Sequence, residues 1–165
     1  MSTTVHYFGK IKSSEAVREL QEEFREIAQV SGWNHEMVDH LFTQEGEMPD
    51  MRLYLRGVRL TFNKTTTPLQ LTFDKDGYLS HIYYEKAPAD LMSPQSKGTR
   101  QVLHQVHTST SIRANDPGTH VAVVKLLDYL KKRYVSNLEV IDNTGYWYSR
   151  DEAALAPKSL ALAKK

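Results

Sequence analysis

The segment from Gln101 to Arg150 constrains the fold most tightly, because it combines a strand, a helix and a second strand. Residues 101–112 alternate between two faces, as a half-buried strand does. Asp116-Pro117 then begins a helix whose apolar residues recur at helical spacing through Tyr134. Leu138–Asp142 is a short apolar strand. Because a strand, a crossover helix and a strand produce two strands of the same direction, the pattern predicts a parallel pair.

The rest of this segment predicts a turn, a strand and a last helix. Asp142-Asn143-Thr144-Gly145 has the composition of a hairpin turn, and Tyr146–Ser149 follows as its return strand. Asp151 then caps an alanine-rich helix, which Pro157 interrupts. Residues 158–165 form a tail with a tendency to fray.

Upstream, the pattern predicts a strand followed by an amphipathic helix. Val5–Phe8 is a short β-prone run. Ser13 or Ser14 caps the helix, and Gly32 ends it. The helix has one apolar stripe, formed by Val17, Leu20, Phe24, Ile27 and Ala28. A single stripe of this kind is typical of a surface helix that lies on a core.

A second, shorter helix is predicted from Asn34 to Phe42, with Asn34 as its cap. Its inward residues are Met37, Val38, Leu41 and Phe42. Trp33 lies between the two helices, either as a core anchor or as a platform for a ligand.

Three strands follow, at residues 58–62, 69–73 and 78–84. Asp76-Gly77 lies between the last two and is a strong hairpin signal, because glycine accepts the positive φ of the turn. The three strands therefore predict an antiparallel meander. Lys86–Gly98 has almost no periodicity and predicts a long loop, either a cover over a pocket or a plain excursion.

The composition limits the classes of protein to which this chain can belong. At 165 residues the chain is long enough for one domain. It has no cysteine, which excludes disulfides and thiolate chemistry, and its net charge of +1 gives no general attraction to nucleic acid. Mean hydropathy is −0.52. No apolar run approaches a membrane span, and Met1–Lys10 lacks a secretory signal pattern, so we expect a soluble cytoplasmic protein.

These observations predict a single α+β domain over residues 1–165. We expect a mixed, mainly antiparallel sheet with helices packed on it. One strand–helix–strand crossover lies near the C-terminal half of the chain.

His104 and His107 have a spacing that could hold a metal ion on a helix. On an alternating strand the same spacing places the two imidazoles on opposite faces. The sequence therefore predicts no paired metal site here, and we expect neither a metal nor a cofactor elsewhere.

The start of the crossover helix offers a second candidate. Asp116 followed by Pro117 is an ordinary helix start, and we predict that the Asp116 carboxylate accepts from a backbone N–H at Gly118 or Thr119. A helix N-terminus also suits an anion, although Asp116 would repel one. His120 lies in the first turn, either as a packed or exposed histidine or as a neutral base.

Topology places further polar residues near this helix start. If the two strands are parallel, the loops after them leave the same sheet edge, where ligands of such sheets usually bind. The residues brought together there would be Arg113, Asp116, His120, Asp142, Asn143 and Thr144. Arg113, Asn143 and Thr144 are the candidate ligand-binding residues, and His120 with Asp142 are the weak catalytic candidates. For Asp142 a plain turn residue is the alternative.

An aromatic run follows the turn. Tyr146, Trp147 and Tyr148 alternate on the predicted strand, so at least one ring would be exposed on a partner-facing surface, where Tyr and Trp are favoured. They could equally be ordinary strand residues. Lys131-Lys132-Arg133 complements the dipole of its helix and does not predict a nucleic-acid site.

Three stretches resemble a family of uncharacterised bacterial proteins: HYFGKI at 6–11, FDKDGYL at 73–79, and GTHVAVVKLLDYLKKRYVSNLEVIDNTGYW at 118–147. The resemblance covers most of the chain and implies no known activity or binding residue. The order of elements is also similar to α+β chaperone-like or immunity-type modules, with helices on one face of a curved sheet.

From sequence we expect a non-catalytic module that binds another protein or a small ligand. The alternative is a small hydrolase-like enzyme that uses His120 with Asp142 or Asp116 at the sheet edge. Nucleic-acid binding is the weakest interpretation, and no membrane partner is expected.

Overall fold

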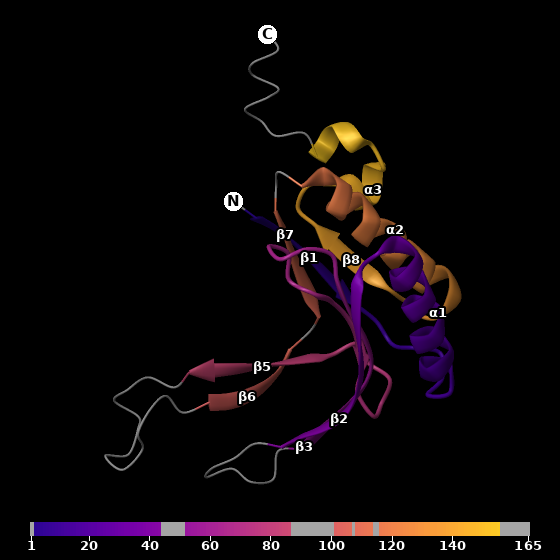
Figure 1. Ribbon diagram of the computed structural model, residues 1–165, viewed down its shortest axis with the longest axis vertical. Coiled ribbons are helices and arrows are strands. Elements are labelled where there is room, and N and C mark those ends of the chain that lie inside the picture. The colour runs from indigo at the N-terminus through magenta and orange to yellow at the C-terminus, as the bar shows by residue number, and fades with distance from the viewer. Residues whose placement is uncertain (1, 44–51, 87–100, 107, 114–115, 156–165) are drawn as a thin grey trace.

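The computed structural model describes residues 2–43, 52–86, 101–106, 108–113 and 116–155, and they form an α+β fold (Figure 1). The helices are α1 (Ala16–Ser31), α2 (Pro117–Arg133), α3 (Tyr146–Ser149) and the short 3₁₀ helix η2 (Glu152–Leu155). The strands are β1 (Ser2–Phe8), β2 (Asn34–Thr43), β3 (Arg52–Thr61), β4 (Leu69–Phe73), β5 (His81–Lys86), β6 (Gln101–Val106), β7 (Ser109–Arg113) and β8 (Glu139–Asp142). The predicted fold class is confirmed.

One sheet has the order β7-β1-β8, with the first strand of the chain in its centre. β1 is antiparallel to both neighbours, and Val5 lies opposite Thr110 on one side and Asp142 on the other. β7 and β8 therefore run in the same direction, as the strand–helix–strand pattern predicts. They are not adjacent, because β1 lies between them while α2 makes the crossover (Figure 1).

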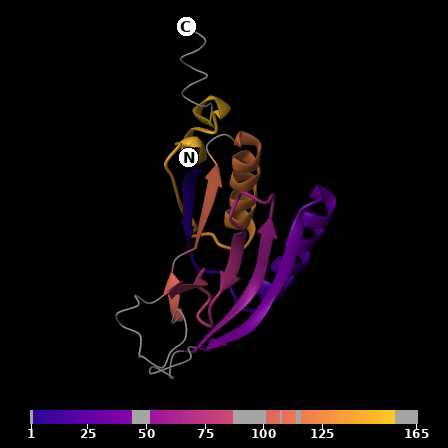
Figure 2. The same cartoon turned by 60° about the vertical axis from the view of Figure 1, so that its left-hand side comes forward.

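The second sheet, β2-β3-β4, is a long curved hairpin with a third strand added (Figure 2). Gly57 lies on β3 opposite Thr72 of β4, with a φ of +156°. A Cβ at this position would lie 1.9 Å from the Leu71 carbonyl oxygen, so the close approach of the two backbones requires glycine.

The predicted turn at Asp76-Gly77 is confirmed. Gly77 has a φ of +89° and donates its N–H to the carbonyl of Asp74 at 3.0 Å. The Asp74 carboxylate accepts from the N–H groups of Asp76 and Tyr78 at 2.9 and 3.0 Å. β5 begins three residues later than predicted, at His81, and pairs with β6 in a separate two-stranded sheet.

The predicted helix at Asn34–Phe42 is wrong, since these residues belong to strand β2. Every residue of β2 lies opposite a residue of β3, from Asn34 with Thr61 to Thr43 with Arg52. This long pairing outweighs the local helical spacing of the apolar residues. Trp33 consequently does not lie between two helices; its ring meets Phe62 edge-on at 4.8 Å.

The single strand predicted for residues 101–112 is also wrong. β6 ends at Val106 and pairs with β5, whereas β7 starts at Ser109 and pairs with β1. The alternating pattern continues across the break, so it does not reveal where the chain passes from one sheet to the other. His107 and the side chain of His104 lie outside the described residues, and so do residues 87–100 of the predicted loop.

The predicted return strand Tyr146–Ser149 is instead the single-turn helix α3. Gly145 has a φ of +80°, and Arg150 donates its N–H to the carbonyl of Tyr146 at 2.8 Å. After it, Asp151 caps η2 through the N–H of Ala153 at 3.0 Å. The residues from 156 onward lie outside the described part of the chain.

α1 ends at Gly32 as predicted, with a φ of +76° there, and the Ser13 hydroxyl accepts from the N–H of Ala16 at 3.3 Å. α1 and α2 lie side by side, and Tyr129 of α2 donates to Glu23 of α1 at 2.5 Å (Figure 2). The buried faces of both helices and of both three-stranded sheets form one continuous hydrophobic cluster. In the described residues, no helix is long and apolar enough to cross a membrane.

Tyr7 connects the two three-stranded sheets inside this core. Its side chain is fully buried on β1. The phenol donates to the carbonyl of Gln70 on β4 at 2.7 Å and accepts from the Gln70 N–H at 3.0 Å. Burial raises the pKa of Tyr7 to about 12, although hydrogen bonds to Thr110, Gln70 and Thr108 oppose the rise.

Candidate functional site

The start of α2 is held by Asp116, and the predicted N-cap is confirmed. One carboxylate oxygen accepts from the N–H of Thr119 at 3.3 Å. The other accepts from the Thr119 hydroxyl at 2.7 Å and from the amide of Asn63 at 3.1 Å. Asp116 therefore ties α2 to the turn after β3.

His120 and Asp142 are brought together, as the topology predicts. Nε2 of His120 donates to Oδ2 of Asp142 at 2.8 Å, because an ionised carboxylate only accepts. His120 reaches this position from the first turn of α2, and Asp142 from the end of β8. Both are buried, with 2% and 4% of their surface exposed.

The Asp142 carboxylate is fully hydrogen-bonded. Oδ1 accepts from the N–H and hydroxyl of Thr144 at 3.0 and 2.7 Å, and Oδ2 also accepts from the N–H of Trp147 at 3.2 Å. Burial alone would raise the pKa of Asp142, but the hydrogen bonds from His120 and Thr144 outweigh burial and lower it. The carboxylate thus connects α2, the turn after β8 and the start of α3.

This arrangement differs from an accessible catalytic pair in one respect. A general base needs an open path to the proton that it removes, and both side chains here are covered. In such a pair His120 would be the base and Asp142 would hold its ring, so the hydrogen bonds of Asp142 do not bear on this difference. In this geometry the pair connects the first turn of α2 to the end of β8.

The structure does not bring Arg113 and Asn143 into this cluster. Both side chains are exposed, and among the described contacts neither bonds to His120 or Asp142. Arg113 ends β7, and its carbonyl accepts from the N–H of Asp116 at 3.1 Å. The expected convergence at the sheet edge is therefore limited to His120, Asp142 and Thr144.

The aromatic run is divided between the core and the surface. Tyr146 is buried, with its ring edge-on to His120 at 6.0 Å. The Arg150 guanidinium covers the ring of half-buried Trp147 at 4.6 Å. Tyr148 is 66% exposed, and its hydroxyl donates to the carbonyl of Val140 at 2.9 Å. One exposed ring is thus confirmed, and its contact with a partner stays a prediction.

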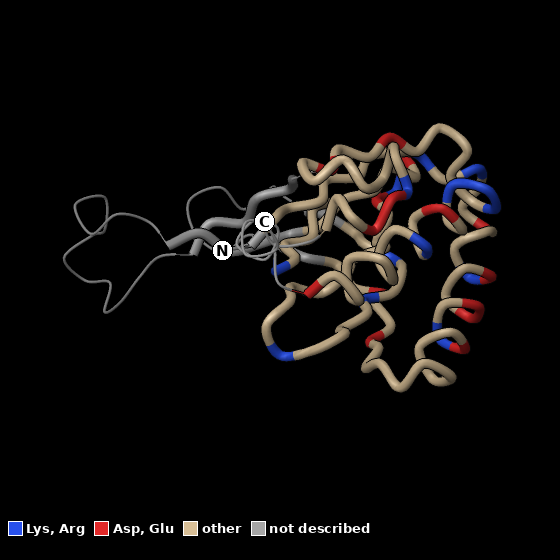
Figure 3. The backbone as a smooth tube through the Cα atoms, turned by 90° about the horizontal axis from the view of Figure 1, so that it is seen from above, with Lys and Arg blue, Asp and Glu red and all other residues tan. Residues whose placement is uncertain are grey.

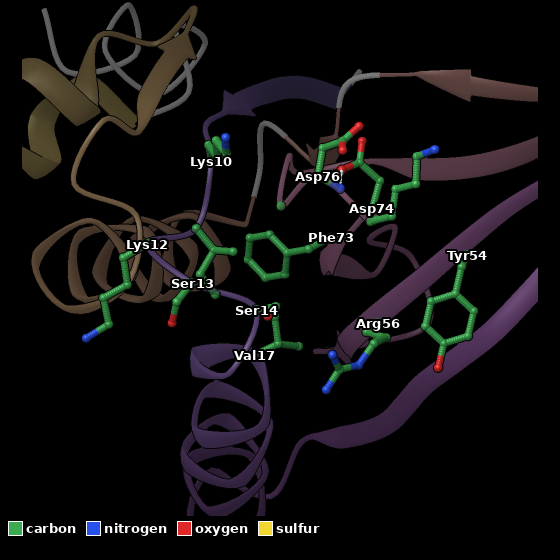
Figure 4. Close-up of a pocket in the computed structure, with 13 residues that line it drawn as sticks. Lys10, Lys12, Ser13, Ser14, Val17, Tyr54, Arg56, Phe73, Asp74 and Asp76 are labelled. Carbon is green, nitrogen blue, oxygen red and sulfur yellow. Dashed lines mark hydrogen bonds between the residues drawn. The ribbon is translucent and has the colours of Figure 1, made fainter.

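A cavity of about 300 Å³ lies away from these residues (Figure 4). It is enclosed by the segment that leads from β1 into α1, by the first turn of α1, by β3, and by the turn after β4. Its apolar walls are the buried side chains of Ile11, Val17 and Phe73, and the half-exposed ring of Tyr54 lies at its rim.

Arg56 supplies a positive charge to this cavity. On β3 it lies opposite Asp39 of β2 and Phe73 of β4. Figure 4 shows its side chain extending from β3 toward the side where Ser14 and Val17 lie. Within the described residues, the guanidinium of Arg56 forms no ion pair within 4.0 Å.

Two lysines of the cavity wall lie near tyrosine rings. The ammonium of Lys10 lies 5.3 Å from the ring of Tyr78, and that of Lys12 lies 5.7 Å from the ring of Tyr134. Neither tyrosine lines the cavity. The basic residues of the cavity wall are Lys10, Lys12, Lys75 and Arg56, and its acidic residues are Asp74 and Asp76.

Sequence patterns did not indicate this cavity. Its residues come from chain segments that are far apart, and Arg56 precedes the strand predicted at residues 58–62. The pairing of β3 with β2 and β4 is what places Arg56 beside Phe73. The run FDKDGYL did mark the turn that forms one wall.

Among the described residues, no three His, Asp or Glu side chains converge to hold a metal ion. Basic and acidic residues are interspersed along the described backbone rather than separated by sign (Figure 3).

No protein-family model matches this chain, and no curated protein or solved structure gives a significant match. The resemblance to uncharacterised bacterial proteins therefore stays a prediction.

Proposed function

We propose that this protein is a non-catalytic binding module whose ligand occupies the cavity between α1, β3 and the turn after β4. The observation that carries the proposal is the chemistry of the cavity. It combines buried apolar walls at Ile11, Val17 and Phe73 with the guanidinium of Arg56, which extends from β3 toward the first turn of α1. A concave, mainly apolar site with a few directed polar groups is the usual form of a small-molecule site.

The state of the His120–Asp142 pair favours binding over catalysis. A hydrolase that used His120 as its base would have to expose the imidazole, which is buried together with Asp142. Asp116, the other candidate partner of His120, is already bonded to Asn63 and Thr119. The alternative of a small hydrolase therefore requires a conformational change, whereas the cavity is already present in the described structure.

A small ligand is favoured over a protein partner because the cavity is concave and enclosed by several elements. The exposed Tyr148 ring is one surface residue, and its hydroxyl is already hydrogen-bonded to Val140. Interspersed charges and a net charge of +1 give no basic face for nucleic acid.

The test is a titration of the ¹⁵N-labelled chain with three probes of similar size: phenylacetate, phenethylamine and benzyl alcohol. At least one should shift the backbone resonances of cavity residues such as Val17 and Phe73 in a saturable way. Substitution of exposed Ser14 by Phe should remove the shifts, since the ring would occupy the cavity.

Glu15→Phe is the matched control, because Glu15 is an exposed neighbour that does not line the cavity. It should leave the shifts unchanged, and thermal melts should show that both variants fold. Saturable shifts that persist in Ser14→Phe, or that centre on other residues, would contradict a site in this cavity.

A further inference from the structure

We propose that two copies of this chain associate through the outer edge of β2, which pairs antiparallel with its own copy about a twofold axis at Met37. The two β2-β3-β4 sheets then form one continuous sheet. This association goes beyond the proposed binding function and does not depend on it, because none of the residues that line the cavity belongs to β2.

The hydrogen-bond pattern shows which residues of β2 direct their backbone groups outward. Val38 lies opposite Gly57 of β3, and Gly57 lies opposite Thr72 of β4. The Thr72 carbonyl accepts from the N–H of Ser80 at 2.8 Å, so Thr72 is turned away from β3 and Gly57 is turned toward β2. Nε2 of Gln21 reaches the carbonyls of both Gly57 and Val38, at 2.9 and 3.4 Å, which places both carbonyls between the two strands. The residues that alternate with Val38 therefore face outward: His35, Met37, Asp39 and Leu41.

This outer edge is open in the part of the chain that the structure describes. β2 is the end strand of its sheet, and among the described contacts its outward backbone groups have no hydrogen-bond partner. α1 covers a face of the sheet instead, since Leu20 and Phe24 belong to the same buried cluster as Val58 of β3. Asn34–Thr43 contains neither Lys nor Pro, with which natural proteins protect such an edge. A strand edge of this kind is a template for another strand.

The alternation of backbone groups limits how β2 can pair with its own copy. Both strands must direct the same set of alternate residues to the shared edge, so the twofold axis has to pass through a residue rather than between two residues. An axis at Glu36 or Asp39 would place two identical carboxylates opposite each other, which is destabilising. An axis at Val38 would place Met37 opposite the partner's Asp39.

An axis at Met37 makes the edge complementary to itself. Met37 then faces the partner's Met37, and His35 faces the partner's Asp39 on both sides of the axis. An imidazole N–H donates to a carboxylate, and the side chain of Met37, which is 40% exposed in the single chain, is removed from water. Glu36 keeps its ion pair with Arg59 at 3.6 Å. Such self-complementarity is what an isologous twofold interface requires.

Sedimentation equilibrium at pH 7.5 tests the association. The average mass of the wild-type chain should rise with concentration from 18.9 kDa toward twice that value. Met37→Lys should weaken association about tenfold or more, because two ammonium groups would meet at the axis. Ile141→Lys is the matched control, since Ile141 is 49% exposed on β8, an end strand of the other three-stranded sheet. It should leave the association unchanged.

Disulfide cross-linking tests the register. The chain has no cysteine, so an engineered thiol is the only one present. Met37→Cys should form an intermolecular disulfide with oxidised glutathione, because facing Cα atoms lie about 5.5 Å apart in such a pair. Leu41→Cys is the control, since Leu41 is 47% exposed but would lie roughly 26 Å from its copy at about 3.3 Å per residue. It should stay monomeric on a non-reducing gel.

Charge exchange between two chains tests the facing pair. His35→Glu and Asp39→Lys should each weaken self-association. An equimolar mixture of the two variants should associate again, because the introduced carboxylate of one chain faces the introduced ammonium of the other. Contacts within one chain are the same in the mixture and cannot explain the recovery.

The outcomes are decisive in both directions. A wild-type chain that stays monomeric at the highest concentration used for NMR would overturn the proposal. So would equal cross-linking of Met37→Cys and Leu41→Cys, or a mixture that associates no better than its two components. Thermal melts show whether each variant folds, and the two cysteine variants keep the test valid if a charged variant does not.

Discussion

At the scale of single residues, Asp116 should contribute measurably to stability as the cap of α2. Asp116→Ala should lower the free energy of unfolding by about 0.5–2 kcal/mol, because the N–H of Thr119 loses its acceptor. Asp116→Asn should cost less, since its amide oxygen still accepts while the interaction of charge with the helix dipole is lost. Chemical denaturation of the three proteins at pH 7 measures both differences. Equal midpoints for Ala and wild type would contradict the capping role.

Asp142 should make stability depend on acid pH. Its pKa is lower in the folded protein than the ordinary value of 3.8, so the folded state favours the ionised form. The stabilisation is therefore complete above the pKa of the unfolded chain and is lost as the pH falls through the folded pKa. We expect the free energy of unfolding to decrease from about pH 5 downward.

Asp142→Asn isolates this contribution, because Glu23 and Asp128 also have lowered pKa values and act in both proteins. The variant should be less stable at pH 7 by about 1–3 kcal/mol, since an amide cannot accept all four hydrogen bonds. Its stability should then change less between pH 5 and pH 3 than that of the wild type. Parallel pH profiles for the two proteins would show that Asp142 is not the group responsible.

At the scale of elements, the pairing of β3 with β4 should not tolerate a side chain at Gly57. A Cβ there would lie 1.9 Å from the carbonyl oxygen of Leu71, and this neighbour is backbone. Gly57→Ala should therefore cost at least about 1–3 kcal/mol, as overpacking of a dense region does. Gly118→Ala is the control, because a Cβ there meets no atom within 4 Å. Similar melting temperatures for the two variants would contradict the close approach.

Local sequence signals predicted the elements that are determined locally. The stripe of α1, the cap at Asp116 and the turn at Gly77 all depend on neighbouring residues, and all three are confirmed. At β2 the local signal is misleading, because Met37, Val38 and Leu41 have spacings that suit a helix. Its strand conformation comes from pairing with β3, which no local pattern contains.

The same distinction applies to the candidate site. Topology predicted that His120 and Asp142 would meet, since both follow strands of the same direction. Burial could not be predicted, because it results from the packing of α3 over the pair. The cavity around Arg56 depends on the relative placement of four segments, and that placement is a tertiary property.

At the scale of the whole molecule, the two three-stranded sheets should unfold together. Tyr7 joins β1 to β4 through its hydrogen bond with Gln70. The turn before β4 is joined to β7, because the Thr67 hydroxyl accepts from the N–H of Ser111 at 2.7 Å. Both sheets also share one hydrophobic cluster. A shared core of this kind is expected to give a single cooperative transition.

The two tryptophans allow this expectation to be measured. Trp33 reports on the β2–β3 sheet through its contact with Phe62, and Trp147 reports on the region of β8 and α3. Trp33→Phe and Trp147→Phe each leave one fluorescent probe. In each variant, the unfolding transition followed by fluorescence should coincide with the transition followed by far-UV circular dichroism over the whole range of denaturant concentration. A fluorescence transition that precedes loss of secondary structure would reveal two independent units.

The central place of β1 has a consequence for how the chain is made. Its residues leave the ribosome before their partners in β7 and β8, which follow much later in the sequence. At roughly 5–20 residues per second, β1 waits on the order of ten seconds for its neighbours. Val5 and Tyr7 are fully buried in the folded protein. During that time their side chains remain exposed to solvent and to other molecules in the cell. This sheet therefore closes only after β7 and β8 are made, and β1 stays without its partners while the residues between them are synthesised.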